Sequence, residues 1–449
     1  MHANRSARTR TRTLAVAAAA GTALLLTSCA GGSINGGSDG GSSDGEAAAW
    51  NDATADLTGV TITFGGGTAG GPLDGAIEAF QEETGATIER TTYPDPYEQN
   101  LQTRVATGDV PDLASWQPTT SMLTSLQAPT NLLPLDDAPW LDSLDPAVRD
   151  IAGFVDDTRY AAITSSPSVM GVYYNKALFE KYGVTELPQS WDEMVEVART
   201  ISAGGDTAFV EAGGAQWPTQ WAVQMQLAEA AQDGLWEDVS TNTTTFADPP
   251  IIDAITEYQS LVDEGLFNAD LKTALFEDQA AQLFTGEGAM ALQVNALLEQ
   301  LLTQHDAAEI DENLGWFPVS GEGTVATTIP DNKNGIVVFK TGDAEREAAA
   351  QQFLTFLMTD YYPTFIEDGG LVSIEPDVEN PDTVPQLAQD IAASLESSVG
   401  SMQSLAIANP DLFINLASLL YGEMTPEEVA DATQQQFAQL AQAQGAEGF

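Results

Sequence analysis

The sequence contains few of the groups on which enzyme catalysis commonly depends. Its 449 residues include one cysteine and two histidines. A single cysteine leaves no partner for an intramolecular disulfide, and it excludes cysteine-based metal sites and CxxC redox chemistry. Neither a G-x-S-x-G nor an H-E-x-x-H motif is present. His2 lies near the N-terminus, and His305 lies in a polar stretch that we expect to be helical and solvated.

Basic residues are also scarce. There are 15 Lys and Arg against 66 Asp and Glu, a formal net charge of -51. Because phosphate binding requires clustered Lys and Arg, this composition argues against nucleic acid and against a basic patch for anionic lipid. So many carboxylates leave a glycosidase-like pair open, but no pair stands out, so we expect no catalytic residue, metal or cofactor. Hydrophobic residues make up 43% of the chain, enough for packed cores.

The N-terminus differs from the rest of the chain. Residues 1–28 combine four Arg in the first 12 positions with an apolar run from Leu14 to Leu26, the pattern of a signal peptide. The run is shorter than the about 20 apolar residues of a permanent membrane helix. It ends in Leu26-Thr27-Ser28-Cys29-Ala30-Gly31, which resembles a bacterial lipobox, whose Cys is acylated and becomes the first mature residue. An ordinary signal peptide with an incidental Cys is the alternative.

We therefore expect lipidation at Cys29. Residues 29–56 would then be the acylated Cys and a flexible tether, because the stretch from Ala30 to Gly45 is almost wholly Gly, Ser, Asp and Asn. A lipid, a tether and a globular body predict an extracytoplasmic protein, anchored to the outer face of the cell membrane by the lipid only.

The body alternates strand and helix patterns. Residues 60–64 are strand-like, Leu73, Ile77 and Phe80 recur at helical spacing, and residues 86–88 begin a second strand. This β-α-β opening is consistent with an open α/β sheet that binds ligands at the carboxyl ends of its strands. The glycine-rich loop at 65–71 lacks both the G-x-G-x-x-G spacing and a phosphate-loop Lys, so it does not indicate a nucleotide site.

Later segments continue the pattern. We expect strands at 169–174, 288–294 and 335–339, and helices at 176–182, 279–284 and 344–358. Two further helices begin with capping boxes, Ser190 with Glu193 and Thr425 with Glu428, and reach Ile201 and Gln444.

Several motifs, in order along the body, resemble the sugar-binding solute-binding proteins of bacterial ABC importers, the maltose-type group known as family 1. They are the segment Ala106-Thr107-Gly108-Asp109-Val110-Pro111-Asp112, Tyr173-Tyr174-Asn175-Lys176, Pro188 with Trp191-Asp192-Glu193, Phe284 with Gly286 and Gly288-Ala289-Met290, Asn334-Gly335-Ile336-Val337-Val338, and Thr425-Pro426-Glu427-Glu428-Val429. Each motif is weak alone, and their succession behind a lipobox makes the resemblance specific.

The resemblance implies a two-lobed α/β periplasmic-binding-protein fold, with a multi-crossing hinge and an inter-lobe ligand cleft. The crossings are expected near Ser166–Ser168, Asp331 and Leu371–Ser373. The first lobe would hold residues 57–166 and 332–372, and the second would hold 168–330 and 374–449. The implied function is capture of a carbohydrate and its delivery to the permease subunits of an ABC transporter, without catalysis and as a monomer.

The resemblance also implies ligand contacts. Sugar sites combine stacked aromatic rings with amides and carboxylates that serve hydroxyl groups. Trp116 matches a site aromatic of the family, with a core Trp as the alternative. Trp217 lies where the second lobe of the family supplies aromatics; its neighbour Trp221 would pack beside it, and one of the two is expected in the core. The other expected contacts are Thr68, Tyr93, Gln117, Ser168, Asn295 and Asn332.

One departure from the family leaves the solute open. Where the family usually has a stacking Trp after its Ala-Met strand, this chain has Leu292-Gln293-Val294-Asn295-Ala296. Asn295 could instead donate or accept hydrogen bonds. The same fold binding a polyamine or another small polar molecule is therefore the main alternative, and a secreted glycoside hydrolase is a further one.

Overall fold

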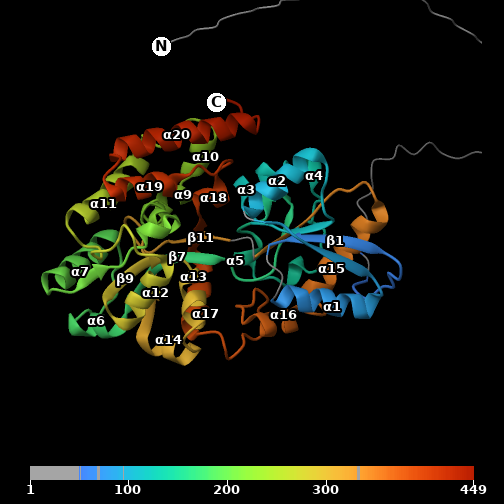
Figure 1. Ribbon diagram of the computed structural model, residues 1–449, viewed down its shortest axis with the longest axis horizontal. Helices are drawn as coiled ribbons and strands as arrows, with labels where there is room; N and C mark the ends of the chain where they lie inside the picture. Colours follow the sequence, from blue (N-terminus) through green and yellow to red (C-terminus); the bar gives the residue numbers. More distant parts are fainter. Residues whose placement is uncertain (1–49, 51, 68–70, 95, 331–333) are drawn as a thin grey trace, which may run out of the picture. The chain divides into compact units, whose positions relative to one another are not determined.

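The computed structural model describes residues 50, 52–67, 71–94, 96–330 and 334–449. Its strands form two large mixed sheets, each covered by helices (Figure 1). The elements built on the first sheet are here named the first lobe, and those built on the second sheet the second lobe.

The first sheet has the strand order β2-β1-β3-β12-β6. β1 pairs in parallel with β2 and β3, whereas β12 is antiparallel to both β3 and β6. The strands are β1 (Thr61–Gly66), β2 (Thr87–Thr92), β3 (Leu113–Ser115), β6 (Ala161–Ile163) and β12 (Gly335–Val338). Because β1 and β3 are parallel, their carboxyl ends meet at one edge of the sheet.

The second sheet has the order β13-β11-β7-β9-β8, and β10 also pairs with β7. β7 is antiparallel to β9, β10 and β11. The strands are β7 (Ser168–Asn175), β8 (Thr207–Phe209), β9 (Gly288–Gln293), β10 (Leu314–Phe317), β11 (Ala326–Ile329) and β13 (Ser398–Gly400). A separate hairpin joins β4 (Phe154–Val155) and β5 (Thr158–Arg159).

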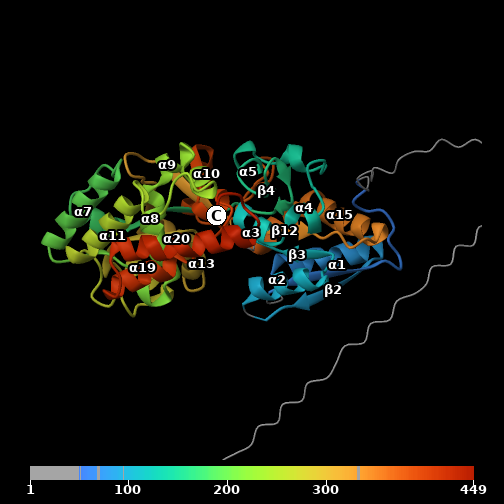
Figure 2. The same ribbon diagram turned by 90° about the horizontal axis from the view of Figure 1, so that it is seen from above.

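Helices cover both sheets. Those of the first lobe are α1 (Pro72–Thr84), α2 (Tyr97–Thr107), α3 (Thr120–Ser125), α4 (Ala128–Asn131), α5 (Pro146–Arg149), α15 (Ala344–Met358) and α16 (Tyr362–Gly369). Figure 2 shows α1, α2, α3, α4 and α15 gathered about β2, β3 and β12. Those of the second lobe are α6 (Lys176–Lys181), α7 (Trp191–Ala203), α8 (Trp221–Gln226), α9 (Ala228–Gln232), α10 (Leu235–Ser240), α11 (Ile251–Asp263), α12 (Phe276–Thr285), α13 (Ala296–Leu302), α14 (Ala307–Asn313), α17 (Gln386–Ala393), α18 (Met402–Leu405), α19 (Leu412–Tyr421) and α20 (Pro426–Ala443).

The two faces of the first sheet carry separate apolar cores. On one face, Phe353 of α15 packs edge-to-face against both Phe64 of β1 and Phe80 of α1. On the other, Leu101 of α2 and Leu123 of α3 pack with neighbouring strand residues. One face of the second sheet packs in a core of its own with α8, α11, α19 and α20, whereas its other face belongs to the same apolar cluster as Phe64.

The chain passes between the sheets more than once. It leaves the first sheet after Ile163 and enters the second at Ser168, and it returns between Ile329 and Gly335. A third passage follows α16, because Leu371 and Val372 lead to α17, which packs on β7 and β10. The lobe boundaries given above stay a prediction.

Local sequence signals account for the starts of two helices, α20 and α7. Thr425 caps α20, and its capping box with Glu428 is complete. Ser190 also caps its helix, α7, but the Glu193 carboxylate accepts from the backbone N–H of Gln189 and not from that of Ser190. The expectation that His305 is helical was wrong: it lies in the bend between α13 and α14, where its side chain is 30% exposed and its ring stacks on Phe284 at 3.7 Å between centroids.

Candidate ligand site

A cavity of about 750 Å³ receives side chains from both lobes and from the crossing segments. This volume lies within the range of small-molecule sites in proteins. Its polar lining comes from Arg90, Ser115, Ser165, Ser166, Ser168, Asn295, Glu299 and Asn334. The cavity therefore lies where both sheets and the segments that join them can contact one ligand.

The first lobe contributes the carboxyl ends of its parallel strands. Gly67 follows β1 and Ser115 ends β3, so both reach the cavity from the same edge of the sheet. The chain is tightly packed behind this edge: a Cβ at Gly65 would lie 2.8 Å from the Tyr93 ring. Glycine at this position therefore allows the Tyr93 ring to close against the strand.

Arg90 is the cation of the described lining, and it is already paired. Its guanidinium forms an ion pair with Asp74 of α1 and lies 5.4 Å from the centroid of the Phe64 ring. The Arg90 side chain is 19% exposed, and among the described residues its buried Nε has no hydrogen-bond partner. The pair thus offers donors and acceptors for hydroxyl groups while carrying no net charge.

Two asparagines hold the crossing segments in place. The Asn334 amide donates to the Ser165 hydroxyl at 2.9 Å and to the Ser166 carbonyl at 3.2 Å. The Asn295 carbonyl accepts from the backbone N–H of Val169 at 3.0 Å. Since its oxygen is used in this way, the amide nitrogen of Asn295 is the group that can donate to a ligand.

The remaining cavity wall is mostly apolar and includes two aromatic residues, Tyr97 and Phe365. On α13, Asn295, Leu298 and Leu302 share one face, because they are spaced three, four and seven residues apart. This face therefore changes from polar near the crossing to apolar along the helix. Other apolar contributors are Leu73, Phe365, Leu371, Val372, Val384 and Ala388.

Of the predicted ligand contacts, Ser168 and Asn295 line the cavity. Gln117 lies close by, where its amide donates to the carbonyl of Pro330 in the second crossing at 2.8 Å. Thr68 and Asn332, like Cys29, lie outside the described residues. The ligand roles of all the predicted contacts stay predictions.

The predicted aromatic contacts Trp116 and Tyr93 do not line the cavity, but both rings pack against Tyr97, which does. Trp116 has no exposed surface, and its indole N–H donates to the Met122 carbonyl at 3.0 Å. Tyr93 is buried against Tyr97, with the Arg104 guanidinium 4.5 Å from its ring centroid, and burial raises the pKa of its hydroxyl. In this arrangement, neither ring presents a face to the cavity.

Of the predicted pair Trp217 and Trp221, one residue lies in the core, as the sequence analysis expected. Trp221 is buried, whereas Trp217 is partly exposed and lies 4.9 Å from the Phe276 ring and 5.8 Å from Trp221, between centroids. Neither is among the residues that line the described cavity.

Sequence reasoning missed much of the polar lining. Ser115 immediately precedes the Trp116 of the sequence prediction, and Ser165 and Ser166 border the predicted crossing. Their proximity to Trp116 and to the predicted crossing could have identified these serines as candidate ligand contacts. Arg90 carried no such signal, because nothing in a single strand sequence shows that its side chain reaches another element.

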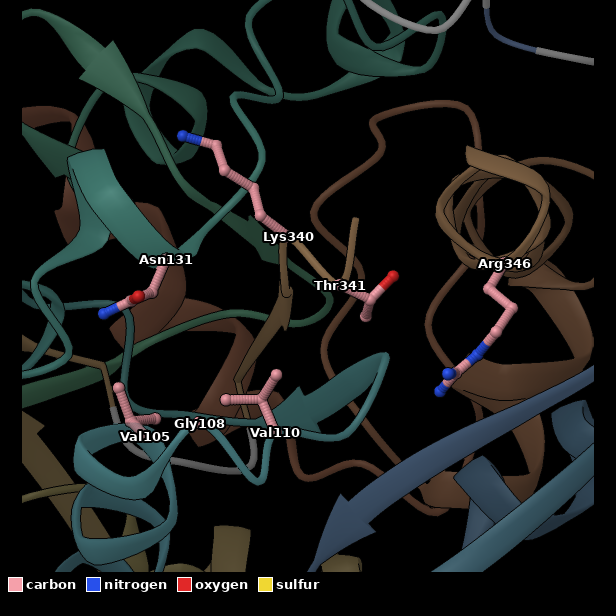
Figure 3. Close-up of a pocket in the computed structure, with 7 residues that line it drawn as sticks. All are labelled: Val105, Gly108, Val110, Asn131, Lys340, Thr341 and Arg346. Atoms are coloured by element: carbon pink, nitrogen blue, oxygen red, sulfur yellow. The ribbon is translucent and has the colours of Figure 1, made fainter. Parts of the chain in front are cut away.

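A second pocket, in the first lobe, is a weaker candidate. It has a volume of about 250 Å³ and is lined by Val105, Gly108, Val110, Asn131, Lys340, Thr341 and Arg346 (Figure 3). Arg346 is bonded at 2.6 Å to the fully buried carboxylate of Asp112, which raises the pKa of Arg346. The Lys340 ammonium donates to the Pro129 carbonyl at 2.8 Å. Both cations are therefore engaged by the protein itself.

In the part of the chain that the structure describes, no helix is long and apolar enough to cross a membrane.

Two mixed α/β lobes with a ligand-sized cavity between them define a class of binding proteins. Comparison with known proteins identifies the family. The family model of the bacterial extracellular solute-binding proteins matches residues 65–360, more than half of the chain. The chain belongs to this family.

Individual relatives are distant. The chain is 25% identical over 221 residues to the multiple sugar-binding protein of Streptococcus mutans serotype c, which covers 48% of this chain and 51% of the relative. It thus spans about half the length of the curated relatives that it matches. Among solved structures, a chitin oligosaccharide binding protein is similar with a TM-score of 0.69, 20% identity and coverage of 85% and 99%. The solute-binding protein RafE in complex with raffinose is similar with a TM-score of 0.65, 17% identity and coverage of 85% and 100%. These structures confirm the predicted two-lobed fold.

Proposed function

We propose that this protein captures a carbohydrate outside the cell and delivers it to the permease of an ABC transporter. The observation that carries the proposal is the cavity lining, in which hydroxyl and amide groups from both lobes accompany the Arg90–Asp74 ion pair and one further carboxylate, Glu299. A neutral, hydroxyl-rich solute can exchange hydrogen bonds with every one of these groups without leaving a buried charge unpaired.

The relatives support the carbohydrate assignment. The protein of Streptococcus mutans is named as a multiple sugar-binding protein, and similar structures are described as binding chitin oligosaccharide and raffinose. With 20% identity or less to those structures, the particular sugar does not carry over. The departure from the stacking Trp expected near Asn295 also leaves the particular sugar open.

The charges of the cavity favour a neutral solute over a polyamine. A polyamine would need two or more carboxylates beside it, whereas the described lining contains one acidic residue, Glu299, and one cation, Arg90. Asp74 lies nearby but is paired with Arg90. To meet a second carboxylate beside Glu299, a polyamine would therefore have to displace an existing ion pair.

Lipidation at Cys29 would keep the binding protein beside its permease. Two or more acyl chains make such anchoring stable, since a single chain binds only marginally. Closure of the lobes would then enclose the solute. A solute can drive closure only if it contacts both lobes, because only differential affinity for the closed state shifts the equilibrium.

Isothermal titration calorimetry against a panel of mono- and oligosaccharides, with spermidine and amino acids included, tests the proposal. We expect a sugar to bind, and we expect Asn295→Ala to weaken its affinity about 2- to 10-fold, the loss of about one neutral hydrogen bond. Asn313→Ala is the matched control, because Asn313 also bonds to the backbone, donating its amide to the Glu309 carbonyl at 2.8 Å, but lies outside both pockets. Heat from spermidine or an amino acid, with none from any sugar, would refute the carbohydrate assignment.

A further inference from the structure

A buried hydrogen bond joins the two lobes at a place distinct from the crossing segments. It links α3 of the first lobe to α18 of the second, and these helices lie side by side (Figure 1). The Ser121 hydroxyl donates to the Gln403 carbonyl at 2.7 Å, and the two residues are 2% and 4% exposed. Leu123 belongs to an apolar cluster of the first lobe and Met402 to one of the second, so this bond connects two different clusters, one from each lobe.

On the second-lobe side, α18 is fixed by buried glutamines. The Gln403 amide donates to the Gln220 carbonyl at 2.8 Å, and Gln224 donates to the same oxygen at 3.0 Å. Gln224 in turn accepts from the backbone N–H of Met402 at 3.0 Å, and Gln220 donates to the Trp217 carbonyl at 3.0 Å. The Gln403 backbone that accepts from Ser121 is therefore held rigidly to the segment that carries Trp217.

On the first-lobe side, α3 is tied to the end of β3. Trp116 donates its indole N–H to the Met122 carbonyl, next to Ser121, and its backbone N–H bonds to the Gly335 carbonyl at 2.9 Å. The preceding residue, Ser115, lines the cavity. A continuous set of bonds thus runs from the cavity wall through Trp116 and α3 to α18.

We infer that Ser121 and Gln403 form an inter-lobe bridge that sets the apparent affinity of the cavity. The inference rests on the proposed function, since it requires that a solute contact both lobes. The bridge is made in the arrangement in which both lobes line the cavity, and it stabilises that arrangement. Because apparent affinity falls with the fraction of molecules in the binding-competent state, loss of the bridge weakens binding without touching the ligand.

Ser121→Ala tests the bridge, because it removes the donor and leaves the Gln403 carbonyl buried without it. The matched control is Ser125→Ala on the same helix, whose hydroxyl donates to the Met122 carbonyl at 2.7 Å within the first lobe. With raffinose and chitin oligosaccharides as calorimetric probes, we expect Ser121→Ala to weaken binding about 3- to 10-fold, as for one hydrogen bond, and Ser125→Ala to leave it unchanged. Unchanged or tighter binding by Ser121→Ala overturns the inference.

A second measurement separates this inference from the choice of sugar. Spin labels at the exposed positions Gln99 of α2 and Asp431 of α20, in a Cys29→Ser background, report the distance between the lobes without any ligand. We expect Ser121→Ala to lengthen or broaden the distance distribution, and Ser125→Ala to match the unsubstituted protein. If no sugar binds to any variant but the distances change, the bridge stands and the carbohydrate assignment fails. If Ser121→Ala leaves the distances unchanged, the bridge is refuted, whichever ligand binds.

Discussion

Glu211 makes the stability of the second lobe depend on pH. It follows β8, is 2% exposed, and accepts hydrogen bonds from the Tyr258 hydroxyl at 2.9 Å and from the Ala212 N–H at 2.8 Å. Burial raises the pKa of Glu211 from 4.5 to about 7, although both hydrogen bonds act in the opposite direction. The neutral acid is therefore the form that this environment prefers.

The direction of this pH dependence follows from comparing the carboxyl group in the folded chain with the same group in the unfolded chain. Below pH 4.5 the carboxyl is protonated in both the folded and the unfolded chain, so it costs no stability. As the pH rises past 4.5, the unfolded chain releases the proton first, and the free energy of unfolding falls until the folded chain also releases it near pH 7. The difference between 4.5 and about 7, at about 1.4 kcal/mol per pH unit, corresponds to a loss of about 3 kcal/mol by pH 8.

The variant Glu211→Gln isolates this effect, because Gln has nearly the same shape and stays neutral at every pH. Its carbonyl can accept from Ala212 and its amide can donate to the Tyr258 oxygen. Urea denaturation followed by tryptophan fluorescence, between pH 4.5 and 8.5, should show the variant gaining up to about 3 kcal/mol on the parent protein as the pH rises. Glu423→Gln, at an exposed position, should show no such slope. A stability difference that stays constant with pH would refute the reasoning.

Two further predictions concern Trp116 and the solute. Trp116→Ala should cost about 3–5 kcal/mol of stability in denaturant titration, because it removes a fully buried side chain from the core that contains Leu123 and Val337. Unchanged stability with weakened sugar binding would instead show that Trp116 contacts the ligand. Affinity for a neutral sugar should change less than about 2-fold in calorimetry between 50 and 500 mM salt, because screening acts on charges. A steep fall in affinity with salt would indicate a charged solute.

Helices and strands that depend on residues close together in the sequence were predictable from the sequence. The strand patterns around residues 60–64 and 86–88 and the spacing of Leu73, Ile77 and Phe80 correspond to β1, β2 and α1. The capping box at Thr425 forms because its partner is three residues away. His305 was misplaced because the turn between α13 and α14 begins before it, and a polar composition does not distinguish a bend from a helix.

The site was less predictable, because it depends on long-range packing. The Arg90 side chain reaches Asp74 and the cavity only after β2 has paired with β1 and α1 has packed on the sheet. Trp116 shows the converse, since its sequence position is compatible with either a ligand contact or a core residue. Trp116 is buried because α3 folds back until the Met122 carbonyl accepts from the indole N–H. The sequence of neither segment predicts this contact.

The distribution of charge explains how so acidic a chain can hold a neutral cavity. Of the acidic residues in the described part of the chain, only Asp112 and Glu211 are buried; Asp112 is neutralised by Arg346, and the raised pKa of Glu211 favours its neutral form. The other described carboxylates are at least partly exposed to water, which screens them from one another. A net charge of -51 spread in this way keeps an exposed protein soluble. This net charge does not require an ionic ligand. The polar groups that line the cavity are mostly uncharged, and the one cation of the lining is paired with Asp74.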